Sequence, residues 1–476
     1  MHNRLEALLD YHQTPDQAGF RHNYSTTDQL FTTTIIHERA REWQQPLWVS
    51  AVDFKEAFDT IHHNKLWQAL THQNIPLPYI RLLQSLYREQ SATVKTDTHS
   101  RRFCIQRGVK QGDPLSSLFF NAVLEDIFKT LKQKWSSHNY GVRLGHTRST
   151  HITNLRFADD VLLYASTLPQ LTTMLNDLQQ TAGICGLELH ADKTVILSNL
   201  SRRRGRQAAT TTTNVNNRPV KILNYAEATK YLGRKLTFDD PHTTEVDHRI
   251  STAWRKFSAL RDELTNARYP LRQRLHLFNA TVTPTALYGC DAWTTTKALS
   301  TKLQRTQRRM LRMIVGTTRR RTYDSTTSPD GATNTTSLED WPDYIKRATI
   351  IAESQIRNAN IDTWPTTCLR RKWKWAAHIA SQQRNRWSRL AVQWQPKLDH
   401  RRHNTRRQAR PHKRWDDDLT NFIPTIQHDA GNQPTQHWLH LAENTNYWLQ
   451  LENQFIAYTT CPTSTMERVQ REGEDR

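Results

Sequence analysis

Short apolar strands alternate with longer amphipathic helices along the first 200 residues of the chain. Apolar and polar residues alternate from Leu47 to Asp53, as in a half-buried strand. Apolar residues recur at helical spacing over Pro76–Gln90, and more strongly over Ser116–Lys132. Two short strands, Ile152–Phe157 and Val161–Ala165, flank an Ala-Asp-Asp turn. This pattern predicts a compact α+β unit.

The same unit continues to about residue 200. A further amphipathic helix is opened by Pro169 and ends at Gly183, and a last strand covers Thr194–Leu197. The stretch Ser201–Arg218 is first basic and then rich in Thr and Asn. Such a composition predicts an exposed loop or linker.

The second half of the chain has a different pattern. Residues 245–316 return to helical periodicity, and Thr322–Ser337 is a second break rich in Ser and Thr. From residue 338 onward the chain is basic, Trp-rich and helical in pattern. We therefore expect a helical second half interrupted by one more linker.

The composition is that of a globular protein with no membrane-spanning segment. At 476 residues the chain is long enough for two or three domains, and no stretch approaches the roughly 20 apolar residues of a membrane helix. The N-terminus is too polar for a secretory signal. Five scattered cysteines without C-x2-C spacing fit a reducing compartment and give no zinc motif. We expect a soluble intracellular protein, in the nucleus or the cytoplasm.

The net charge of +21 is concentrated in the second part of the chain. Residues 1–200 contain 20 Lys and Arg against 19 Asp and Glu, whereas residues 201–476 contain 46 against 26. Between Thr366 and Trp415 there are 15 basic residues, one acid and five interleaved tryptophans. This distribution indicates a surface that binds a polyanion. The alternative stays open that the tryptophans form a small helical core and the charges face solvent.

Three acidic residues are the candidate catalytic groups. Asp53 ends the first strand, and Asp159 and Asp160 occupy the turn between two later strands. Alone, Asp53 is typical of a helix cap and the paired acids of a turn. If the strands are adjacent, the carboxylates meet, and their repulsion becomes a binding site for two divalent ions.

A loop before the strongest predicted helix is the next candidate. It runs from Arg107 to Ser116, and Gly108 and Gly112 allow its backbone to approach a ligand closely. Gln111 places an amide between the two glycines. By itself this loop is a weak signal, because many turns before helices have such residues.

Taken together and in this order, the segments resemble those of non-LTR retrotransposon reverse transcriptases. The resemblance lies in these stretches: Gln17-Ala-Gly-Phe-Arg-His-Asn-Tyr-Ser25 with Asp28, Asp53-x3-Ala-Phe-Asp59, Gly108-Val-Lys-Gln-Gly-Asp-Pro-Leu-Ser116, Phe157-Ala-Asp-Asp160, Gly186-Leu with Lys193-Thr, and Tyr231-Leu-Gly233. Less specifically, Leu287–Trp293 with Thr301–Arg321 is similar to the family's thumb region, and the tryptophan-rich tail to one found after many such polymerases.

The resemblance implies a fold and a set of domains. The fold is a right-hand polymerase palm with partial fingers, followed by a helical thumb and a basic helical C-terminal region. The implied domains are partial fingers at 1–48, the palm at 49–200, a basic Thr-rich linker at 201–220, primer grip and thumb at 221–321, a linker at 322–337 and the C-terminal region at 338–476.

The resemblance also implies an activity and its residues. The chain would be an RNA-directed DNA polymerase with Mg²⁺ (or Mn²⁺), an RNA template, a DNA primer or target and dNTPs as its partners. The implied roles are metal binding by Asp53, Asp159, Asp160 and the Phe54 carbonyl, sugar selection by Phe58, nucleotide contacts by Gln111, Gly112 and Lys193, and primer grip by Tyr231, Leu232 and Gly233.

Departures from the family leave alternatives open. The chain begins after the upstream finger segments that supply basic residues to the triphosphate, and His190 stands where Asn is usual. No partner nuclease of the family is visible in the sequence. A fragment of a larger element or a decayed copy would explain this. The competing functions are a non-catalytic nucleic-acid binder descended from such an enzyme and an RNA-copying RNA polymerase, against which Phe58 argues.

Overall fold

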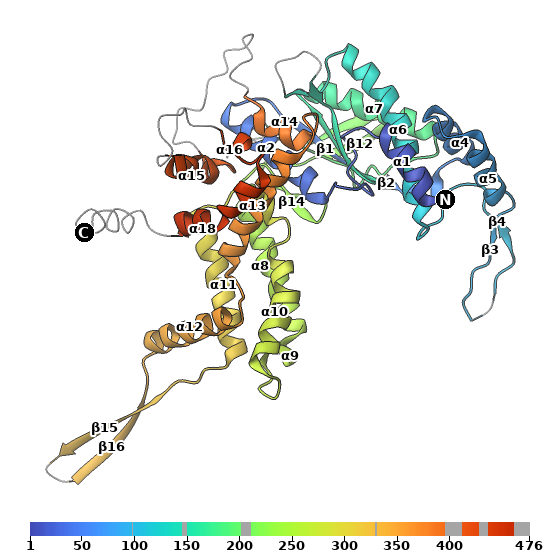
Figure 1. Ribbon diagram of the computed structural model, residues 1–476. Coiled ribbons are helices and arrows are strands. Elements are labelled where there is room, and N and C mark those ends of the chain that lie inside the picture. Colours follow the sequence, from blue (N-terminus) through green and yellow to red (C-terminus); the bar gives the residue numbers. More distant parts are fainter. Residues whose placement is uncertain are drawn as a thin grey trace. The chain divides into compact units, whose positions relative to one another are not determined.

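The computed structural model describes residues 1–97, 99–144, 150–200, 211–328, 331–395, 412–427 and 437–460. Figure 1 shows its helices and strands. The chain divides into two compact units. Unit 1 comprises Met1–Pro241 with Gln382–His412, and unit 2 comprises His242–Ser381 with Lys413–Arg476. None of the helices in these described ranges has the length and apolar character to cross a membrane.

A six-stranded sheet lies at the centre of unit 1, in the order β11-β12-β10-β1-β8-β7. The predicted first strand is confirmed as β1 (Trp48–Val52), which pairs antiparallel with β8 on one side and β10 on the other. The other strands of the sheet are β7 (Asn154–Phe157), β8 (Asp160–Ala165), β10 (Val195–Ser198), β11 (Thr212–Val215) and β12 (Arg218–Ile222). The central position of β1 makes the end of this strand a fixed point of the unit.

Two-stranded pairs lie outside the main sheet. They are β2 (Phe54–Lys55) with β9 (Glu188–Leu189), β3 (Ser91–Ala92) with β4 (Phe103–Cys104), β5 (Val142–Arg143) with β6 (His151–Ile152), and β13 (Thr229–Tyr231) with β14 (Arg234–Leu236). The first and last of these pairs carry residues of the candidate site.

The helices of unit 1 are α1 (His2–His12), α2 (Thr26–Glu42), α3 (Ala57–Thr60), α4 (His63–His72), α5 (Leu77–Tyr87), α6 (Pro114–Ser137), α7 (Leu168–Ile184) and α14 (Trp387–Gln393). Three of them, α5, α6 and α7, lie where apolar periodicity predicted them, and the others were not predicted individually. Helix α6 is longer than the predicted Ser116–Lys132. It begins at Pro114 because the Asp113 carboxylate caps it, accepting a 2.9 Å hydrogen bond from Leu115 N.

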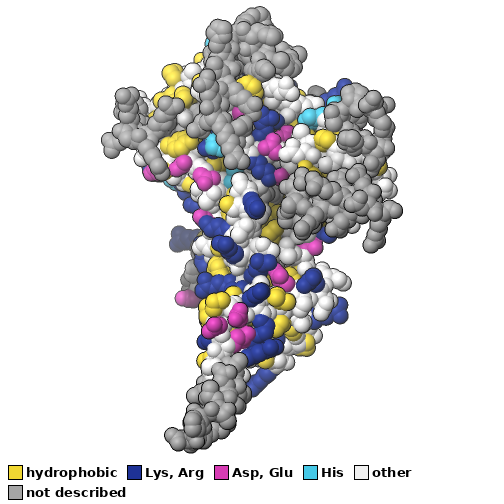
Figure 2. All heavy atoms as spheres, turned by 90° about the vertical axis from the view of Figure 1, so that its left-hand side faces the viewer, with side chains coloured by type: hydrophobic (Ala, Val, Ile, Leu, Met, Phe, Trp, Pro, Cys, Tyr) yellow, Lys and Arg dark blue, Asp and Glu magenta, His cyan; other side chains and the backbone are white. Residues whose placement is uncertain are grey.

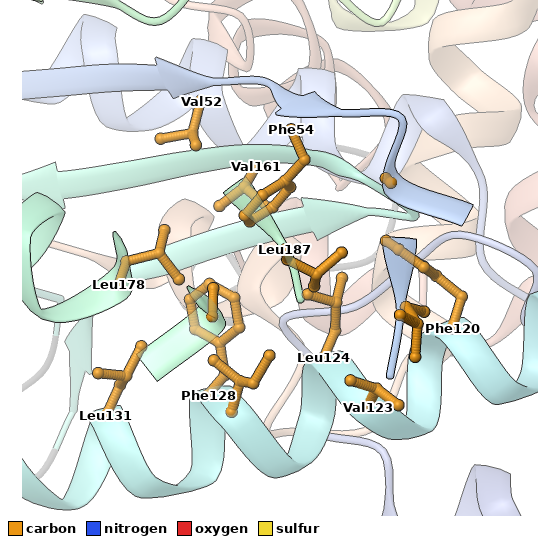
Figure 3. Close-up of a cluster of buried hydrophobic side chains, with 14 of the residues drawn as sticks. Val52, Phe54, Phe120, Val123, Leu124, Phe128, Leu131, Val161, Leu178 and Leu187 are labelled. Carbon is orange, nitrogen blue, oxygen red and sulfur yellow. The ribbon is translucent and has the colours of Figure 1, made fainter. Parts of the chain in front are cut away.

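The main core of unit 1 lies between the sheet and the helices α6 and α7. Figure 3 shows Val52 and Val161 from the sheet facing Leu124, Phe128 and other side chains of α6. The exposed fractions of these residues are 3% or less. Burial of such side chains contributes roughly 1.5–3 kcal/mol each, so this core holds β1 and β8 together.

The other face of the sheet packs against α2, and a late segment of the chain packs on α2 in turn. The Tyr164 hydroxyl of β8 lies 2.8 Å from the Thr33 hydroxyl of α2. Gln382 donates to Asp28 Oδ1 at 2.8 Å, and Trp387 Nε1 donates to Asp16 Oδ1 at 2.7 Å. Residues 382–395 therefore complete unit 1, although the sequence assigned them to the C-terminal region.

The prediction of a loop over Ser201–Arg218 is wrong for its described part. Residues 212–222 form the hairpin of β11 and β12 at the edge of the main sheet. Val215, Val220 and Ile222 are buried in the core, with exposed fractions of 5% or less. The prediction failed because the segment is rich in Thr and Asn, as loops are, although Thr is also frequent in strands. Residues 201–210 lie outside the described residues.

Unit 2 is mainly helical, as the periodicity of residues 245–316 and the region after 338 predicted. Its helices are α8 (Pro241–Ala259), α9 (Arg261–Thr265), α10 (Leu271–Ala286), the 3₁₀ helix η1 (Cys290–Ala292), α11 (Lys297–Val315), α12 (Trp341–Asn358), α13 (Trp364–Ser381), α15 (Asp417–Gln427), α16 (Trp438–Leu441), α17 (Thr445–Gln450) and α18 (Glu452–Thr460). The predicted break at Thr322–Ser337 is instead a hairpin of β15 (Arg321–Ser328) and β16 (Gly331–Leu338).

Most tryptophans of the C-terminal region are core residues. Trp373 stacks on Trp448 with ring centroids 3.8 Å apart, and both are fully buried. Trp415 and Trp438 are buried beside them, and Trp394 is buried in unit 1. Of the five interleaved tryptophans, Trp373, Trp394 and Trp415 are thus core residues, which argues against base stacking by these three rings, whereas Trp375 and Trp387 are half-buried. The part of the basic run from residue 396 to residue 411 lies outside the described residues.

Candidate active site

The three candidate acidic residues lie at one end of the central sheet. The pairing of β1 with β8 ends at Val52 and Val161, so the next residues in register are Asp53 and Asp160. Phe157 pairs with Asp160 across the β7–β8 hairpin, which leaves Ala158 and Asp159 as a two-residue turn. Strand register thus places Asp53, Asp159 and Asp160 at the same end of the sheet.

The turn that carries Asp159 is conformationally strained. Ala158 has a φ of 56°, in the left-handed region. This conformation costs an L-residue other than glycine about 1–2 kcal/mol. Ala158 is 6% exposed, so its surroundings can compensate for the strain.

Burial and neighbouring charge raise the pKa of Asp159 and of Asp160. Partial loss of hydration, followed by the charges of Asp159 and Asp53, raises the pKa of Asp160 to about 6. Burial and the charge of Asp53 also raise the pKa of Asp159, against a hydrogen bond from backbone that lowers it. A cation bound at this end of the sheet would remove the repulsion.

Asp53 is held by its backbone, and one of its carboxylate oxygens lacks a hydrogen bond. His190 N donates to Asp53 O at 2.8 Å, and Asp53 N donates to Thr194 Oγ1 at 3.4 Å. Asp53 Oδ2 is buried and accepts no hydrogen bond, while the Lys193 ammonium lies 3.2 Å from it as an ion pair. A buried carboxylate oxygen whose one close partner is a cation fits a site for a positive ion.

These groups fit divalent ions that substrate phosphates help to bind. Among the described residues no three His, Cys, Asp or Glu side chains form a ready-made metal cage. Mg²⁺ generally keeps several waters and binds through one or two carboxylates plus substrate phosphates. The carboxylates of Asp53 and Asp159 are hard oxygen donors of the kind that Mg²⁺ prefers, and the Asp160 carboxylate lies beside them.

Phe58 and Gln111 lie on two segments that are bound together. Val109 N donates to Phe58 O at 2.7 Å, and Gln111 Nε2 donates to Asp59 Oδ2 at 2.9 Å. Gly108, with a φ of 88°, approaches α3 so closely that a Cβ would lie 2.6 Å from Asp59 O. The structure therefore joins the loop after Arg107 to the segment after Asp53.

The remaining predicted residues are distributed around this centre. The Phe58 ring stacks on Phe120, with centroids 4.6 Å apart, and meets the Phe20 ring edge-on at 6.5 Å. Phe54 is a buried core residue on β2. Around Gly112, at a φ of 86°, a Cβ would meet open space.

The β13–β14 hairpin carries the predicted primer grip. Tyr231 pairs with Arg234 across a turn in which Leu232 and Gly233 both have positive φ. Tyr231 is buried without a hydrogen-bond partner for its hydroxyl. Burial, followed by the proximity of Tyr164 and Asp160, raises its pKa well above the usual value. This hairpin thus lies within electrostatic reach of the carboxylates.

A buried polar network that had not been predicted from the sequence lies beside the β7–β8 hairpin. Arg156 of β7 is fully buried, and its Nη2 lies 2.7 Å from Glu125 Oε2 and 3.7 Å from Asp16 Oδ2. Lys132 also binds Asp16, at 2.6 Å. Buried Gln17 contacts the turn itself. Gln17 lies in a stretch that resembles the family, but buried ion pairs have no periodic signal in the sequence.

A sheet end with carboxylates from two adjacent strands is the kind of site that enzymes of phosphoryl transfer use. Comparison with known proteins gives the particular family. Residues 1–236 match the family described as "Reverse transcriptase (RNA-dependent DNA polymerase)". This segment of the chain is a reverse transcriptase domain.

Relatives extend this similarity. A transposon-derived protein of Caenorhabditis elegans is 29% identical over 308 residues, which cover 63% of this chain and 94% of that protein. A Pol polyprotein from the retrotransposable element R2 of Popillia japonica is 33% identical over 198 residues, 41% of this chain and 27% of the polyprotein. The chain thus spans little more than a quarter of the polyprotein.

A solved telomerase structure resembles the chain only distantly. Apo telomerase from Candida tropicalis aligns with 92% of this chain and 60% of its own, at 12% identity and a TM-score of 0.38. A score this low supports no further comparison.

Proposed function

We propose that this chain is an RNA-directed DNA polymerase of a non-LTR retrotransposon, which transfers a nucleotide from a dNTP to a primer 3′-hydroxyl. The observation that carries the proposal is the register of β1 and β8, which brings Asp53, Asp159 and Asp160 to one end of the sheet. In a reverse transcriptase domain, that acidic end is the natural place for the chemistry.

The proposed site residues have distinct tasks. Asp53 and Asp159, with the Phe54 carbonyl, would hold Mg²⁺ (or Mn²⁺), and Asp160 would add charge. When bound, the ions activate the 3′-hydroxyl and stabilise the departing pyrophosphate. The protein groups orient the reactants, because in-line phosphoryl transfer mainly needs positioning and neutralised charge. Lys193, beside Asp53, is placed to neutralise phosphate charge.

Selection and grip involve the surrounding segments. The Phe58 ring, fixed against Phe120, would meet the sugar 2′ position and exclude ribonucleotides. Gln111 and Gly112 would lie against the incoming nucleotide, and the turn at Tyr231, Leu232 and Gly233 would hold the primer end. In this proposal residues 49–200 are the palm.

The proposed partners are an RNA template, a DNA primer or target and dNTPs. Unit 2 has positive charge that could bind such polyanions. Figure 2 shows many Lys and Arg side chains, in dark blue, on the surface of its helices. On α11, Arg305 and Arg309 are exposed one turn apart. Binding through such residues should weaken steeply with added salt.

Primer extension on an RNA template tests the proposal. The wild-type chain should extend a DNA primer with Mg²⁺ and dNTPs, and Asp159→Ala should lower the rate by a factor on the order of a thousand or more. Asp126→Ala is the control, since it removes a half-buried carboxylate of the same unit, with a side chain 30% exposed, that binds His72 and lies on α6 away from the acidic turn.

The outcomes separate the candidate functions. Extension with dNTPs that is lost in Asp159→Ala and kept in Asp126→Ala supports the proposal. Binding of the primer and template without any extension favours the alternative of a non-catalytic nucleic-acid binder. A preference for NTPs points to an RNA polymerase, and extension unaffected by Asp159→Ala contradicts the site.

A further inference from the structure

The turn formed by Ala158 and Asp159 contacts a segment that lies about 140 positions earlier in the chain. Residues 16–18 run beside β7, where Arg156 N donates to Asp16 O at 2.7 Å and Ala18 N donates to Arg156 O at 2.9 Å. Gln17 forms a parallel bridge with Arg156. The segment thus extends the sheet by one short strand, on the far side of β7 from β8.

The Gln17 side chain satisfies both polar backbone groups of Ala158. Its Oε1 accepts from Ala158 N at 2.9 Å, and its Nε2 donates to Ala158 O at 3.3 Å. Oε1 also accepts from Gly19 N at 2.8 Å. Gln17 is fully buried, so water cannot replace these bonds. One amide therefore fixes the peptide planes on both sides of the left-handed residue.

Glycine at position 19 is required for this close approach. A Cβ there would overlap Ala158 N and lie 2.9 Å from Phe157 C, and both are backbone atoms that cannot move aside. Asn121 Nδ2 of α6 donates to Gly19 O at 2.8 Å and fixes the glycine in turn. The backbone of the turn thus packs directly against Gly19, which is itself bound to α6.

We propose that Gln17 is a positioning residue for the cation site, which holds Ala158 in its left-handed conformation and so orients the carboxylates of Asp159 and Asp160. The inference rests on the proposed function, since it takes Asp159 as a cation ligand and Asp160 as added charge beside it. Gln17 itself touches no reacting atom. Its amide acts through the backbone, because Ala158 C=O belongs to the same peptide unit as Asp159 N.

The test is Mn²⁺ affinity of the full chain with a 3′-deoxy primer, an RNA template and a dNTP bound, measured by electron paramagnetic resonance with the dNTP alone as the blank, because substrate phosphates help to bind the ions. Gln17→Met keeps the volume of the side chain and removes its three hydrogen bonds to backbone. We expect the Mn²⁺ dissociation constant to rise about 10–100-fold, as it does when a residue that orients metal ligands is lost. Thermal unfolding checks that the variant is folded at the temperature used.

Gln29→Met is the matched control. Gln29 is 2% exposed, and its Nε2 donates to Asp16 O and Arg156 O, each at 2.8 Å. It therefore stabilises the same buried strands without touching the turn. Its Mn²⁺ dissociation constant should stay within about twofold of the wild type. An equal loss in both variants would show a general structural effect and overturn the inference.

A second substitution covers the case in which Gln17→Met does not fold. Gln17→Asn keeps the amide but is one methylene shorter, so it cannot keep the bonds to both Ala158 N and Ala158 O. Weaker Mn²⁺ binding in this variant, with Gln29→Met normal, supports the inference, and wild-type binding overturns it.

The design separates failure of the inference from failure of the proposed function. Wild-type Mn²⁺ binding that Asp159→Ala abolishes establishes the site, and unchanged binding in Gln17→Met then overturns the positioning role alone. Wild-type protein that binds no Mn²⁺ through Asp159 overturns both.

Discussion

Removal of Arg156 should destabilise the hairpin that carries the candidate carboxylates, and a second substitution should restore much of the loss. The guanidinium is fully buried, and its Nη2 lies 2.7 Å from Glu125 Oε2, whose side chain is 4% exposed. Arg156→Met leaves the Glu125 carboxylate buried without a cation. Breaking a buried ion pair in this way costs about 3–5 kcal/mol.

The double variant Arg156→Met, Glu125→Leu removes both charges. Asp16 keeps Lys132 at 2.6 Å and Trp387 at 2.7 Å, so no carboxylate of the network is left without a hydrogen-bonded partner. In the wild type, Arg156 Nε and Nη1 have no hydrogen-bond partner, so the ion pair is not fully compensated for its burial. The double variant should therefore lie within about 1 kcal/mol of the wild type.

Hydrogen exchange of the β7 and β8 amides is the appropriate assay, because the two units need not unfold together. Exchange free energies in these strands should fall by about 3–5 kcal/mol in Arg156→Met and recover in the double variant. A loss of exchange free energy below about 1 kcal/mol in the single variant would refute the reasoning. So would a double variant whose loss equals the sum of the losses in the two single variants.

Three further results are expected. Phe58→Val should lower the preference for dNTPs over NTPs by about 10–100-fold in primer extension, because the smaller side chain leaves room for the 2′-hydroxyl of the sugar. An unchanged ratio of dNTP to NTP incorporation would contradict the proposed role of Phe58. Trp387→Phe should destabilise unit 1 by about 1.5–3 kcal/mol in hydrogen exchange through loss of the bond to Asp16, with unit 2 unaffected. Burial alone would raise the pKa of Asp16, but Lys132, Arg156 and hydrogen bonds outweigh it and hold the pKa below 3.8. The stability that Asp16 contributes is therefore complete above about pH 4 and lost as pH falls through the folded pKa. In Asp16→Asn, the urea concentration at the unfolding midpoint should therefore fall less steeply as the pH is lowered below about 4 than it does in the wild type.

The sequence predicted those parts of unit 1 that have a regular apolar period. The strand at β1, the helices α5, α6 and α7, and the strands around Asp159 all have such a period, and the structure contains each of them. The convergence of Asp53 with Asp160 was also predictable, because strand ends and a tight hairpin constrain where a carboxylate lies.

Polar long-range contacts were not predictable in the same way. The β11–β12 and β15–β16 hairpins lie in Thr-rich stretches whose composition resembles that of loops. The attachment of α14 to unit 1 depends on hydrogen bonds from Gln382 and Trp387 to residues more than 350 positions earlier. The role of Gln17 depends on the backbone of one turned residue. A sequence shows these residue types but not their partners.

The most direct test of the central claim is the position of bound Mn²⁺ in crystals of the chain with a primer, an RNA template and a dNTP. Anomalous diffraction should show two peaks about 3.5–4 Å apart between the carboxylates of Asp53 and Asp159. Peaks that lie elsewhere, with none at this end of the sheet, would contradict the claim that these carboxylates hold the catalytic ions.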